Sequence, residues 1–358
     1  MGTNLFRDHD WGEWIEGRDL LPFIHGAAQA RVKGRRVVFR RGDGSQELLD
    51  SISELYVGRL GQTAGIRIEV KTNSPCVLMR GCTRWVRTGD LRRNWARIRY
   101  GYAMDSGRKT WKTRHCRKRH PGCRWAISLG GEGHHYIYLP TGSCTELSGL
   151  KFVKGSWFQP VRYGLSWMAF GDSHTQGGYC SSPSLNFPAL VHRRLGIDYY
   201  NCGIDGYLLD TNVPQTFDLN CDVITILAGT NCYNKQESVS VRELYVKLFS
   251  HFMQRFPEVP ILVISPFFRQ YVSQGRKRGV AAESCPGEFN VTHEQIREAC
   301  HEAFESVKDE RMEIVNGLTM VDRRDMLVDQ LHANDRGMCA LADGLSPMLR
   351  SLLERSVA

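Results

Sequence analysis

Hydrophobic and polar positions follow different patterns in the two parts of the chain. Up to about residue 158, short segments alternate apolar and polar residues, and turns rich in Gly, Asn, Asp and Pro separate them. Such alternation predicts β-strands with one buried face. The clearest examples are residues 37–40, 66–70, 95–100 and 136–139. Because few windows show a helical period, we predict a small β-sandwich of the jelly-roll type here.

From about residue 164 the pattern changes to apolar runs of strand length that alternate with amphipathic helices. The predicted strands are residues 167–170, 199–201, 223–228, 261–264 and 312–315. The predicted helices are residues 187–191 and beyond, 242–256, 293–307 and 338–353. Alternation of this kind predicts a parallel sheet between two layers of helices, as in a flavodoxin-like α/β fold.

The change in pattern predicts two domains, an N-terminal β-sandwich over residues 1–160 and an α/β domain over residues 161–358. A length of 358 residues suits two domains. The hydrophobic fraction of 42% and the charged fraction of 24% are ordinary for a soluble globular protein. There is no apolar run of about 18 residues, which excludes a membrane span. Since no signal peptide is visible, we expect a cytoplasmic protein, with secretion as the alternative if a leader has been removed.

The formal net charge of +9 is concentrated in one segment. Between Arg80 and Arg124 there are about fifteen Lys and Arg residues against two acids, Asp90 and Asp105. Tryptophans and tyrosines are interleaved with these cations. We favour a solvated basic face on the sandwich, with the aromatic residues in the core. Binding of nucleic acid, of an anionic glycan or of another subunit remains an alternative.

The twelve cysteines are scattered along the chain. Without a signal peptide, free buried thiols are the favoured interpretation. The His and Cys residues of segment 115–123 do not match the spacing of a structural zinc site, and the neighbouring cations repel a metal ion. We therefore expect no metal.

The motif with the clearest chemistry is Gly171-Asp172-Ser173-His174, directly after the predicted strand 167–170. A residue on the turn that ends a parallel strand lies at the carboxyl edge of the sheet, where open α/β folds place their chemistry. Three later segments strengthen the signal, namely residues 201–206, 229–231 and 329–332. Ser173 is accordingly the candidate nucleophile.

Ester hydrolysis by a serine also needs a base, a group that orients the base, and donors for the oxyanion. His332 is the candidate base, and Asp329, three residues earlier, is the candidate orienting carboxylate. Asp325 and Asp335 flank the same region and are alternatives to Asp329. The expected reaction requires no cofactor.

The candidate oxyanion donors come from three segments. They are the backbone N–H groups of Ser173 and Gly206 and the side-chain amide of Asn231. A glycine at position 206 lets the backbone approach the substrate closely. Gly203 is a second candidate, although such a glycine more often only permits a turn.

These four segments resemble the conserved blocks of the SGNH hydrolase superfamily, the GDSL-like esterases and lipases, over about residues 160–353. The resemblance assigns the nucleophile to Ser173, the oxyanion donors to Gly206 and Asn231, and the Asp-x-x-His pair to Asp329 and His332. Some bacterial members carry an N-terminal β-sandwich before the first block. They include carbohydrate esterases that remove acetyl groups, so the resemblance implies an acetylated sugar as substrate.

One residue departs from the family pattern. His174 follows the nucleophile, where the family usually has an apolar residue, and we interpret it as a pocket-edge residue or else a surface histidine. Asp172 is expected to hold the turn by accepting backbone N–H groups. The histidines on predicted helices, His192, His251 and His293, are expected on the surface.

The sequence therefore predicts a serine esterase, and the family resemblance implies short acyl esters as substrates, foremost an acetyl ester of a sugar. Three alternatives stay open. The first is a thioesterase or lipase for longer acyl chains, and the second is an acyltransferase with the same residues. The third is a glycan- or nucleic-acid-binding protein whose hydrolase domain is vestigial. The sequence does not define the oligomeric state.

Overall fold

The computed structural model describes residues 9–42, 44–85, 98–105, 112–116, 123–232, 238–269 and 291–357. The chain forms two compact units. The N-terminal unit comprises Met1–Asp43, Gly58–Gly164 and Ser182–Ser184, and the C-terminal unit comprises Gly44–Val57, Leu165–Ser181 and Leu185–Ala358. The sequence placed residues 44–57 in the first domain, whereas their contacts group them with the C-terminal unit. Most of the basic segment lies outside the described residues. The same is true of the His/Cys segment 115–123, of which only some backbone is described.

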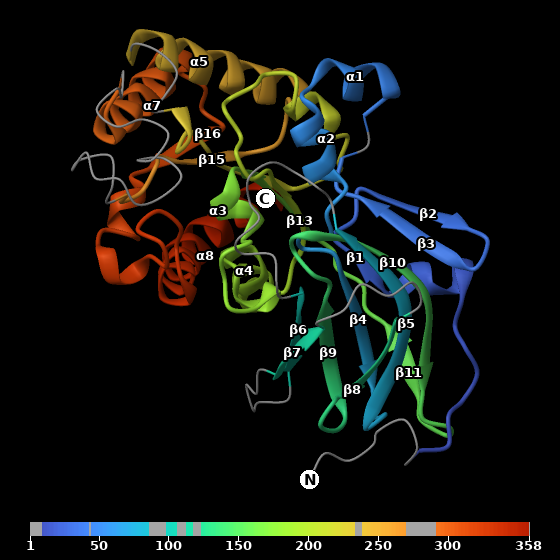
Figure 1. The fold of residues 1–358 in the computed structure, drawn as a ribbon. Helices are drawn as coiled ribbons and strands as arrows, with labels where there is room; N and C mark the ends of the chain where they lie inside the picture. The colour runs from blue at the N-terminus through green and yellow to red at the C-terminus, as the bar shows by residue number, and fades with distance from the viewer. Residues whose placement is uncertain are drawn as a thin grey trace. The chain divides into compact units, whose positions relative to one another are not determined.

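The N-terminal unit contains two antiparallel sheets (Figure 1). One sheet has the order β1-β4-β9-β6-β7, with β11 also paired to β4. Its strands are β1 (Ile24–His25), β4 (Arg67–Thr72), β6 (Ile98–Asp105), β7 (Lys112–Cys116), β9 (Gly133–Tyr138) and β11 (Phe158–Pro160). The other has the order β2-β3-β10-β5-β8. Its strands are β2 (Gln29–Lys33), β3 (Arg36–Arg40), β5 (Cys76–Trp85), β8 (Cys123–Ser128) and β10 (Ser143–Phe152).

Apolar side chains from both sheets form one core. Along β10, buried and partly exposed positions alternate from Ser143 to Leu147, as expected for a strand with one face in a core. The pairing of β10 with β5 shifts register between Leu147 and Gly149. The core includes Val37, Phe39, Ile66, Ile68, Val70, Val77, Met79, Ile137, Leu139, Leu147, Leu150 and Phe152. The predicted antiparallel β domain is thus confirmed.

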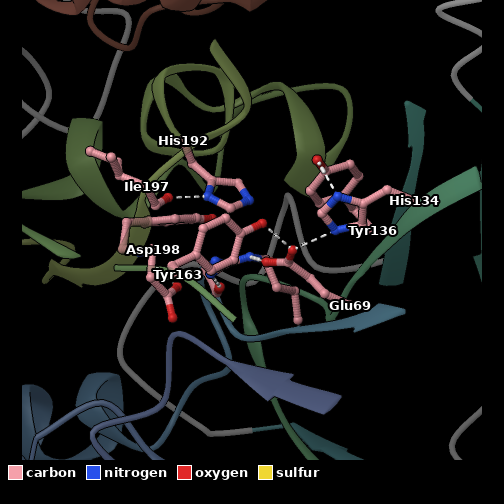
Figure 2. Close-up of polar contacts among 10 residues, drawn as sticks. Glu69, His134, Tyr136, Tyr163, His192, Ile197 and Asp198 are labelled. Atoms are coloured by element: carbon pink, nitrogen blue, oxygen red, sulfur yellow. Dashed lines mark hydrogen bonds and ion pairs between the residues drawn. The ribbon is translucent and has the colours of Figure 1, made fainter. Parts of the chain in front are cut away.

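A buried polar network lies in the sheet that contains β4 (Figure 2). Glu69 and Arg67 are both fully buried, and the Arg67 Nε donates to Glu69 Oε1 at 2.5 Å. The other carboxylate oxygen of Glu69 accepts from the Tyr163 hydroxyl at 2.5 Å and lies 2.9 Å from His134 Nε2. His134 Nδ1 lies 3.0 Å from the Tyr136 hydroxyl. Both oxygens of the buried carboxylate therefore have partners, as a charge in a core requires.

The C-terminal unit contains a five-stranded parallel sheet in the order β13-β12-β14-β15-β16. This order, 2-1-3-4-5 along the chain, is that of a flavodoxin-like sheet. The strands are β12 (Ser166–Gly171), β13 (Asp198–Gly203), β14 (Val223–Leu227), β15 (Ile261–Ile264) and β16 (Met312–Val315). β14 and β15 are buried at every position, as expected for strands covered on both faces.

Two pairs of helices cover the sheet, with α4 against α8 on one face and α5 against α7 on the other (Figure 1). The α-helices are α1 (Gln46–Ser51), α2 (Glu54–Leu60), α3 (Ser173–Gln176), α4 (Phe187–Leu195), α5 (Ser238–Arg255), α7 (His293–Val307) and α8 (Asp335–Val357). Short 3-10 turns occupy Gly17–Phe23, Pro183–Leu185, Pro214–Thr216, Gly317–Thr319 and Arg324–Met326.

The helix ends follow local sequence signals. Asn186 caps α4 by accepting from the N–H of Ala189, and Pro188 lies in the first turn. Thr292 and Gln295 form a reciprocal capping box at the start of α7. The bounds of α7 and β16 agree with the sequence prediction, and the three-layer α/β architecture is confirmed.

Two further expectations concern membranes and thiols. Among the described helices, none is long and apolar enough to span a bilayer. No disulfide joins any of the cysteines whose side chains are described, namely Cys76, Cys82, Cys144, Cys180, Cys202, Cys221, Cys232, Cys300 and Cys339.

Candidate active site

The turn after β12 places Ser173 at the carboxyl end of this strand, which lies between β13 and β14. Asp172 caps α3, because its Oδ1 accepts from the N–H of His174 at 3.0 Å. Gly177 ends the helix with φ of 76°, and its N–H donates to the Ser173 carbonyl at 3.0 Å. Gly171 must lack a side chain, since a Cβ there would lie 2.1 Å from the Leu227 carbonyl oxygen. The sequence Gly-Asp-Ser therefore builds a one-turn helix whose first residue is the candidate nucleophile.

The segment after β13 packs directly against this turn. The amide of Asn201 donates to the Thr175 carbonyl at 2.8 Å, and its oxygen accepts from the Gly203 N–H at 3.1 Å. A Cβ on Gly203 would lie 2.1 Å from the backbone nitrogen of Gln176. Gly203 is thus required for close packing, which agrees with the alternative that it only permits the turn.

Three side chains form a continuous row of hydrogen bonds. The Asp329 Oδ2 lies 2.8 Å from His332 Nδ1, and His332 Nε2 lies 3.0 Å from Ser173 Oγ. The His332 N–H also donates to Asp329 Oδ1 at 2.8 Å. Burial on its own would raise the pKa of Asp329, but these hydrogen bonds from His332 and one from the Leu331 N–H outweigh it and lower that pKa.

The ionised state of Asp329 determines the tautomer of His332. A carboxylate can only accept hydrogen bonds, so the Nδ1 of His332 carries the proton that faces it. In the neutral ring Nε2 is then an acceptor, and it faces the Ser173 hydroxyl. A base oriented in this way can remove the proton from an attacking serine.

The other two carboxylates near this row have different partners. Asp335 accepts from the backbone N–H of Ser181 at 2.8 Å and also from its hydroxyl. Asp325 pairs with Arg336 and Arg323. Asp329 is therefore the carboxylate that contacts His332, as the sequence predicted.

The two predicted oxyanion donors beyond Ser173 lie beside each other. Gly206 is in a turn closed by the bond from the Tyr207 N–H to the Ile204 carbonyl at 3.1 Å, and its φ of 82° suits glycine. The Asn231 Nδ2 donates to the Tyr207 carbonyl at 3.1 Å. One N–H of that amide thus holds the Gly206 turn. The segments that carry these donors follow β13 and β14, the two neighbours of β12.

The segment Gly229–Asn231 is itself held in place by buried groups. Gly229 has a φ of 107°, and a Cβ there would lie 1.8 Å from the Tyr245 hydroxyl. That hydroxyl donates to the Ala228 carbonyl at 2.7 Å, and Arg269 donates to the Thr230 carbonyl at 2.7 Å. Arg269 was not recognised from the sequence, where it is one of many arginines.

His174 is buried within the site rather than on the surface. Only 1% of it is exposed, and its ring lies 4.3 Å from that of Phe267 and 5.4 Å from that of His332. Burial first, then the charges of His332, Arg269 and His293, lower its pKa well below the ordinary value. The ring is therefore neutral at neutral pH. His192 and His293 are also buried, so the prediction that they lie on the surface is wrong; Figure 2 shows His192 with its Nδ1 at the Ile197 carbonyl.

Asp172 is a buried carboxylate next to the hydrogen-bonded row. Burial raises its pKa to about 6, against the lowering effect of the His174 N–H, the nearby His332 and contacts with Thr230. Its predicted role in the turn agrees with its bond to the His174 N–H.

One aromatic contact of the candidate base, His332, was not predicted from the sequence. The ring of Tyr179 stacks on that of His332, with centroids 3.4 Å apart and an angle of 6° between the planes. Tyr179 follows the double glycine at 177–178, which gave no signal of such a role.

Residues 169–339 match the model of the GDSL-like Lipase/Acylhydrolase family. These residues form a GDSL-like acylhydrolase domain. The family match identifies the chain as an ester-hydrolysing enzyme, as the sequence resemblance indicated. A search of curated proteins finds no match.

Several solved structures share the fold of the whole chain. The salicylyl-acyltransferase SsfX3 from a tetracycline biosynthetic pathway has a TM-score of 0.75 at 19% identity, over 92% of this chain and 94% of its own. A putative GDSL-like lipase from Bacteroides ovatus has a TM-score of 0.73 at 16% identity, over 96% of this chain and 98% of its own. A family two carbohydrate esterase from Cellvibrio japonicus has a TM-score of 0.60 at 12% identity, over 96% of this chain and 98% of its own. At these identities the likeness shows a shared fold, an SGNH hydrolase domain preceded by an antiparallel β domain.

Proposed function

We propose that this acylhydrolase is a serine esterase that removes short acyl groups, acetyl foremost, from a carbohydrate. The observation that carries the proposal is the row of hydrogen bonds from Asp329 through His332 to Ser173. It supplies an oriented base within reach of a hydroxyl, which is the arrangement that serine acyl transfer needs.

In the proposed mechanism, Ser173 Oγ attacks the ester carbonyl while His332 Nε2 takes its proton. The charge on the carbonyl oxygen is stabilised by the N–H groups of Ser173 and Gly206 and by the Asn231 amide. The imidazolium, held by Asp329, then protonates the leaving alcohol. Water, deprotonated by the same nitrogen, attacks the acyl-enzyme and releases the acid and the free serine.

The proposed substrate class rests on two supports. An N-terminal antiparallel β domain precedes the hydrolase domain, and several structures with this fold are named as family two carbohydrate esterases. The second support is His174, which follows the nucleophile where the family usually has an apolar residue; we propose that its ring narrows the acyl pocket. These two features favour a small acyl group on a sugar over a long acyl chain.

The decisive experiment measures hydrolysis of p-nitrophenyl esters from acetyl to decanoyl, followed by acetate release from an acetylated sugar. Wild type is compared with Ser173→Ala and with Ser346→Ala, a control serine whose hydroxyl donates within α8. We expect kcat to fall by roughly 10⁵-fold in Ser173→Ala and to stay unchanged in the control.

Other results would change the assignment. A rate that rises with chain length would overturn the short-chain proposal in favour of a lipase or thioesterase. Acyl transfer to an added alcohol in preference to water would indicate an acyltransferase. Turnover that does not depend on Ser173 would overturn the mechanism and make glycan or nucleic-acid binding the next hypothesis to test.

A further inference from the structure

A segment from the first part of the chain packs beside the turn that carries Gly206. Residues 44–57 belong to the C-terminal unit and contain α1 and most of α2. The segment is attached at its start by the bond from the Gly44 N–H to the Thr216 carbonyl at 3.2 Å. Its second helix places two neighbouring side chains, Leu55 and Tyr56, against the Gly206 turn.

Tyr56 connects two backbone groups of this turn. Its hydroxyl accepts from the Leu208 N–H at 3.2 Å and donates to the Gly206 carbonyl at 3.5 Å. The ring also meets that of Tyr207 edge to face, with centroids 6.0 Å apart. Burial raises the pKa of Tyr56, so its hydroxyl keeps the proton that it donates.

The backbone just after this turn is strained. Leu209 has a φ of 59°, in the left-handed region that a leucine rarely adopts. Two side chains from distant parts of the sequence hold the stretch before it, Asn231 at the Tyr207 carbonyl and Tyr56 at Gly206 and Leu208. An N–H that binds an oxyanion must be held in place before the reaction, and these contacts do that for Gly206.

Leu55 lies on the same side of the turn and is accessible. Its Cδ2 is 3.6 Å from the point that a Cβ on Gly206 would occupy, and the side chain is one of the exposed large apolar groups among the described residues. An oxyanion bound at Gly206 has the acyl group and the alcohol attached to its own carbon, one bond away. A side chain in contact with Gly206 is therefore within reach of one of these groups.

We infer that residues 44–57 are part of the active site. Tyr56 is a positioning residue for the oxyanion turn, and Leu55 contacts an apolar part of the bound ester next to the scissile bond. The inference rests on the proposed role of Gly206 in ester hydrolysis. It adds a specificity-determining contact that lies more than a hundred residues before the first catalytic block.

The role of Tyr56 is tested by Tyr56→Phe, with Tyr136→Phe as a control that removes a tyrosine hydroxyl in the N-terminal unit. Loss of the hydroxyl leaves the turn less fixed, so we expect kcat on p-nitrophenyl acetate to fall about tenfold with KM within about twofold. The rate at which a p-nitrophenyl phosphonate labels Ser173 should fall in parallel, since that reaction develops the same oxyanion. A lower melting temperature with unchanged kcat and labelling rate would show that Tyr56 is only structural.

The role of Leu55 is tested by Leu55→Ala, with Trp157→Ala as a control that removes an exposed apolar group elsewhere. One substrate series varies the acyl chain on p-nitrophenol, and the other varies the alcohol of acetate esters. We expect kcat/KM to fall about tenfold for the larger members of one series and to stay constant across the other. The series in which kcat/KM falls shows whether Leu55 contacts the acyl side or the alcohol side of the ester. Unchanged selectivity in both series would overturn the contact.

The two proposals fail in different ways. If wild type hydrolyses esters through Ser173 but the Tyr56 and Leu55 variants behave like their controls, this inference is wrong and the esterase stands. If wild type hydrolyses none of the esters, the proposed function is wrong. Phosphonate labelling of Ser173 then still tests Tyr56, because it needs no natural substrate.

Discussion

A carboxylate and a histidine are paired in each unit of this protein, and the two pairs differ in what surrounds them. In the N-terminal unit Glu69 is fully buried, and its partners include Arg67, Tyr163 and His134. In the C-terminal unit the side chain of Asp329 is 40% exposed, and His332 connects it to Ser173. The first pair is enclosed by groups that neutralise and satisfy it. The Asp329–His332 pair ends on the Ser173 hydroxyl at the edge of a sheet, so the proton of that hydroxyl can move to His332.

A histidine–carboxylate contact acquires its chemistry from its position in the fold. Glu69 lies in the middle of a strand, where side chains pack into a core. Asp329 and His332 follow β16, the last strand of a parallel sheet, and Ser173 follows β12, the first of its strands along the chain. The turns at that edge are exposed to ligands, which strand interiors are not. We therefore expect substitutions in the first pair to change stability and those in the second to change rate.

The largest expected effect is that of Asp329→Asn on activity. The amide can donate to His332 Nδ1 and so favours the tautomer in which Nε2 can no longer accept from Ser173. We expect kcat to fall by roughly 10³–10⁴-fold with little change in the free energy of unfolding. Steady-state hydrolysis of p-nitrophenyl acetate and urea unfolding check both parts. A fall of less than tenfold would show that Asp329 does not orient the base.

The next effect is that of Glu69→Gln on stability. Removal of one charge of a buried pair leaves the Arg67 guanidinium without its counter-charge, so the free energy of unfolding should fall by about 3 kcal/mol. Urea unfolding measures this loss. The kcat per folded molecule should stay at the wild-type value, and a large loss of kcat without a loss of stability would contradict the contrast between the two pairs.

A substitution at Asp172 is expected to raise the free energy of unfolding, whereas Glu69→Gln lowers it. Its pKa is about 6 in the folded protein and 3.8 ordinarily, so between these values the folded chain holds more protons than the unfolded chain. Stability therefore falls as pH rises from about 4 to 6, by about 3 kcal/mol in total. Asp172→Asn keeps an acceptor for the His174 N–H but carries no charge.

We expect the Asp172→Asn variant to become progressively more stable than wild type as pH rises through this window, and to stay so at pH 7–8. Urea unfolding from pH 4.5 to 8 measures the difference, with the exposed Asp322→Asn as a control. Parallel stability profiles for wild type and Asp172→Asn would show that the buried charge has no such cost.

The smallest expected effect concerns the aromatic ring on the base. Tyr179 stacks on His332 and can stabilise the imidazolium that forms as Ser173 attacks. Tyr179→Phe keeps the ring face, so kcat should stay within about twofold, whereas Tyr179→Leu should lower kcat roughly fivefold. Equal kcat values for the two variants would show that the stacked face does not contribute.

Much of the α/β unit could be predicted because its signals are local. The apolar run 223–228 and the helical period of 293–307 each depend on neighbouring residues alone, and they correspond to β14 and α7. Ser173, His332 and Asp329 could be identified because each lies in a short motif with a fixed spacing. The structure then brought the three side chains into one row.

The parts that were missed depend on contacts between distant segments. Nothing in the sequence around Tyr56 indicates that its hydroxyl meets a backbone more than 150 residues later, at Leu208. The stacking of Tyr179 on His332 and the burial of His293 are likewise results of packing rather than of local pattern. Residues 44–57 belong to the C-terminal unit through contacts with distant segments, so their local composition could not predict this grouping.

The separation of Ser173 from His332 by 159 residues also affects when the protein becomes active. During synthesis, β12 emerges before both of its partners in the sheet, β13 and β14. Contacts over such distances form slowly, because a long loop must close before they stabilise the chain. A nascent chain that ends before residue 332 can hold a folded sandwich and an exposed serine without its base. On the proposed mechanism, hydrolysis begins only after His332 has been synthesised and has docked beside Ser173, so the unfinished chain is inert.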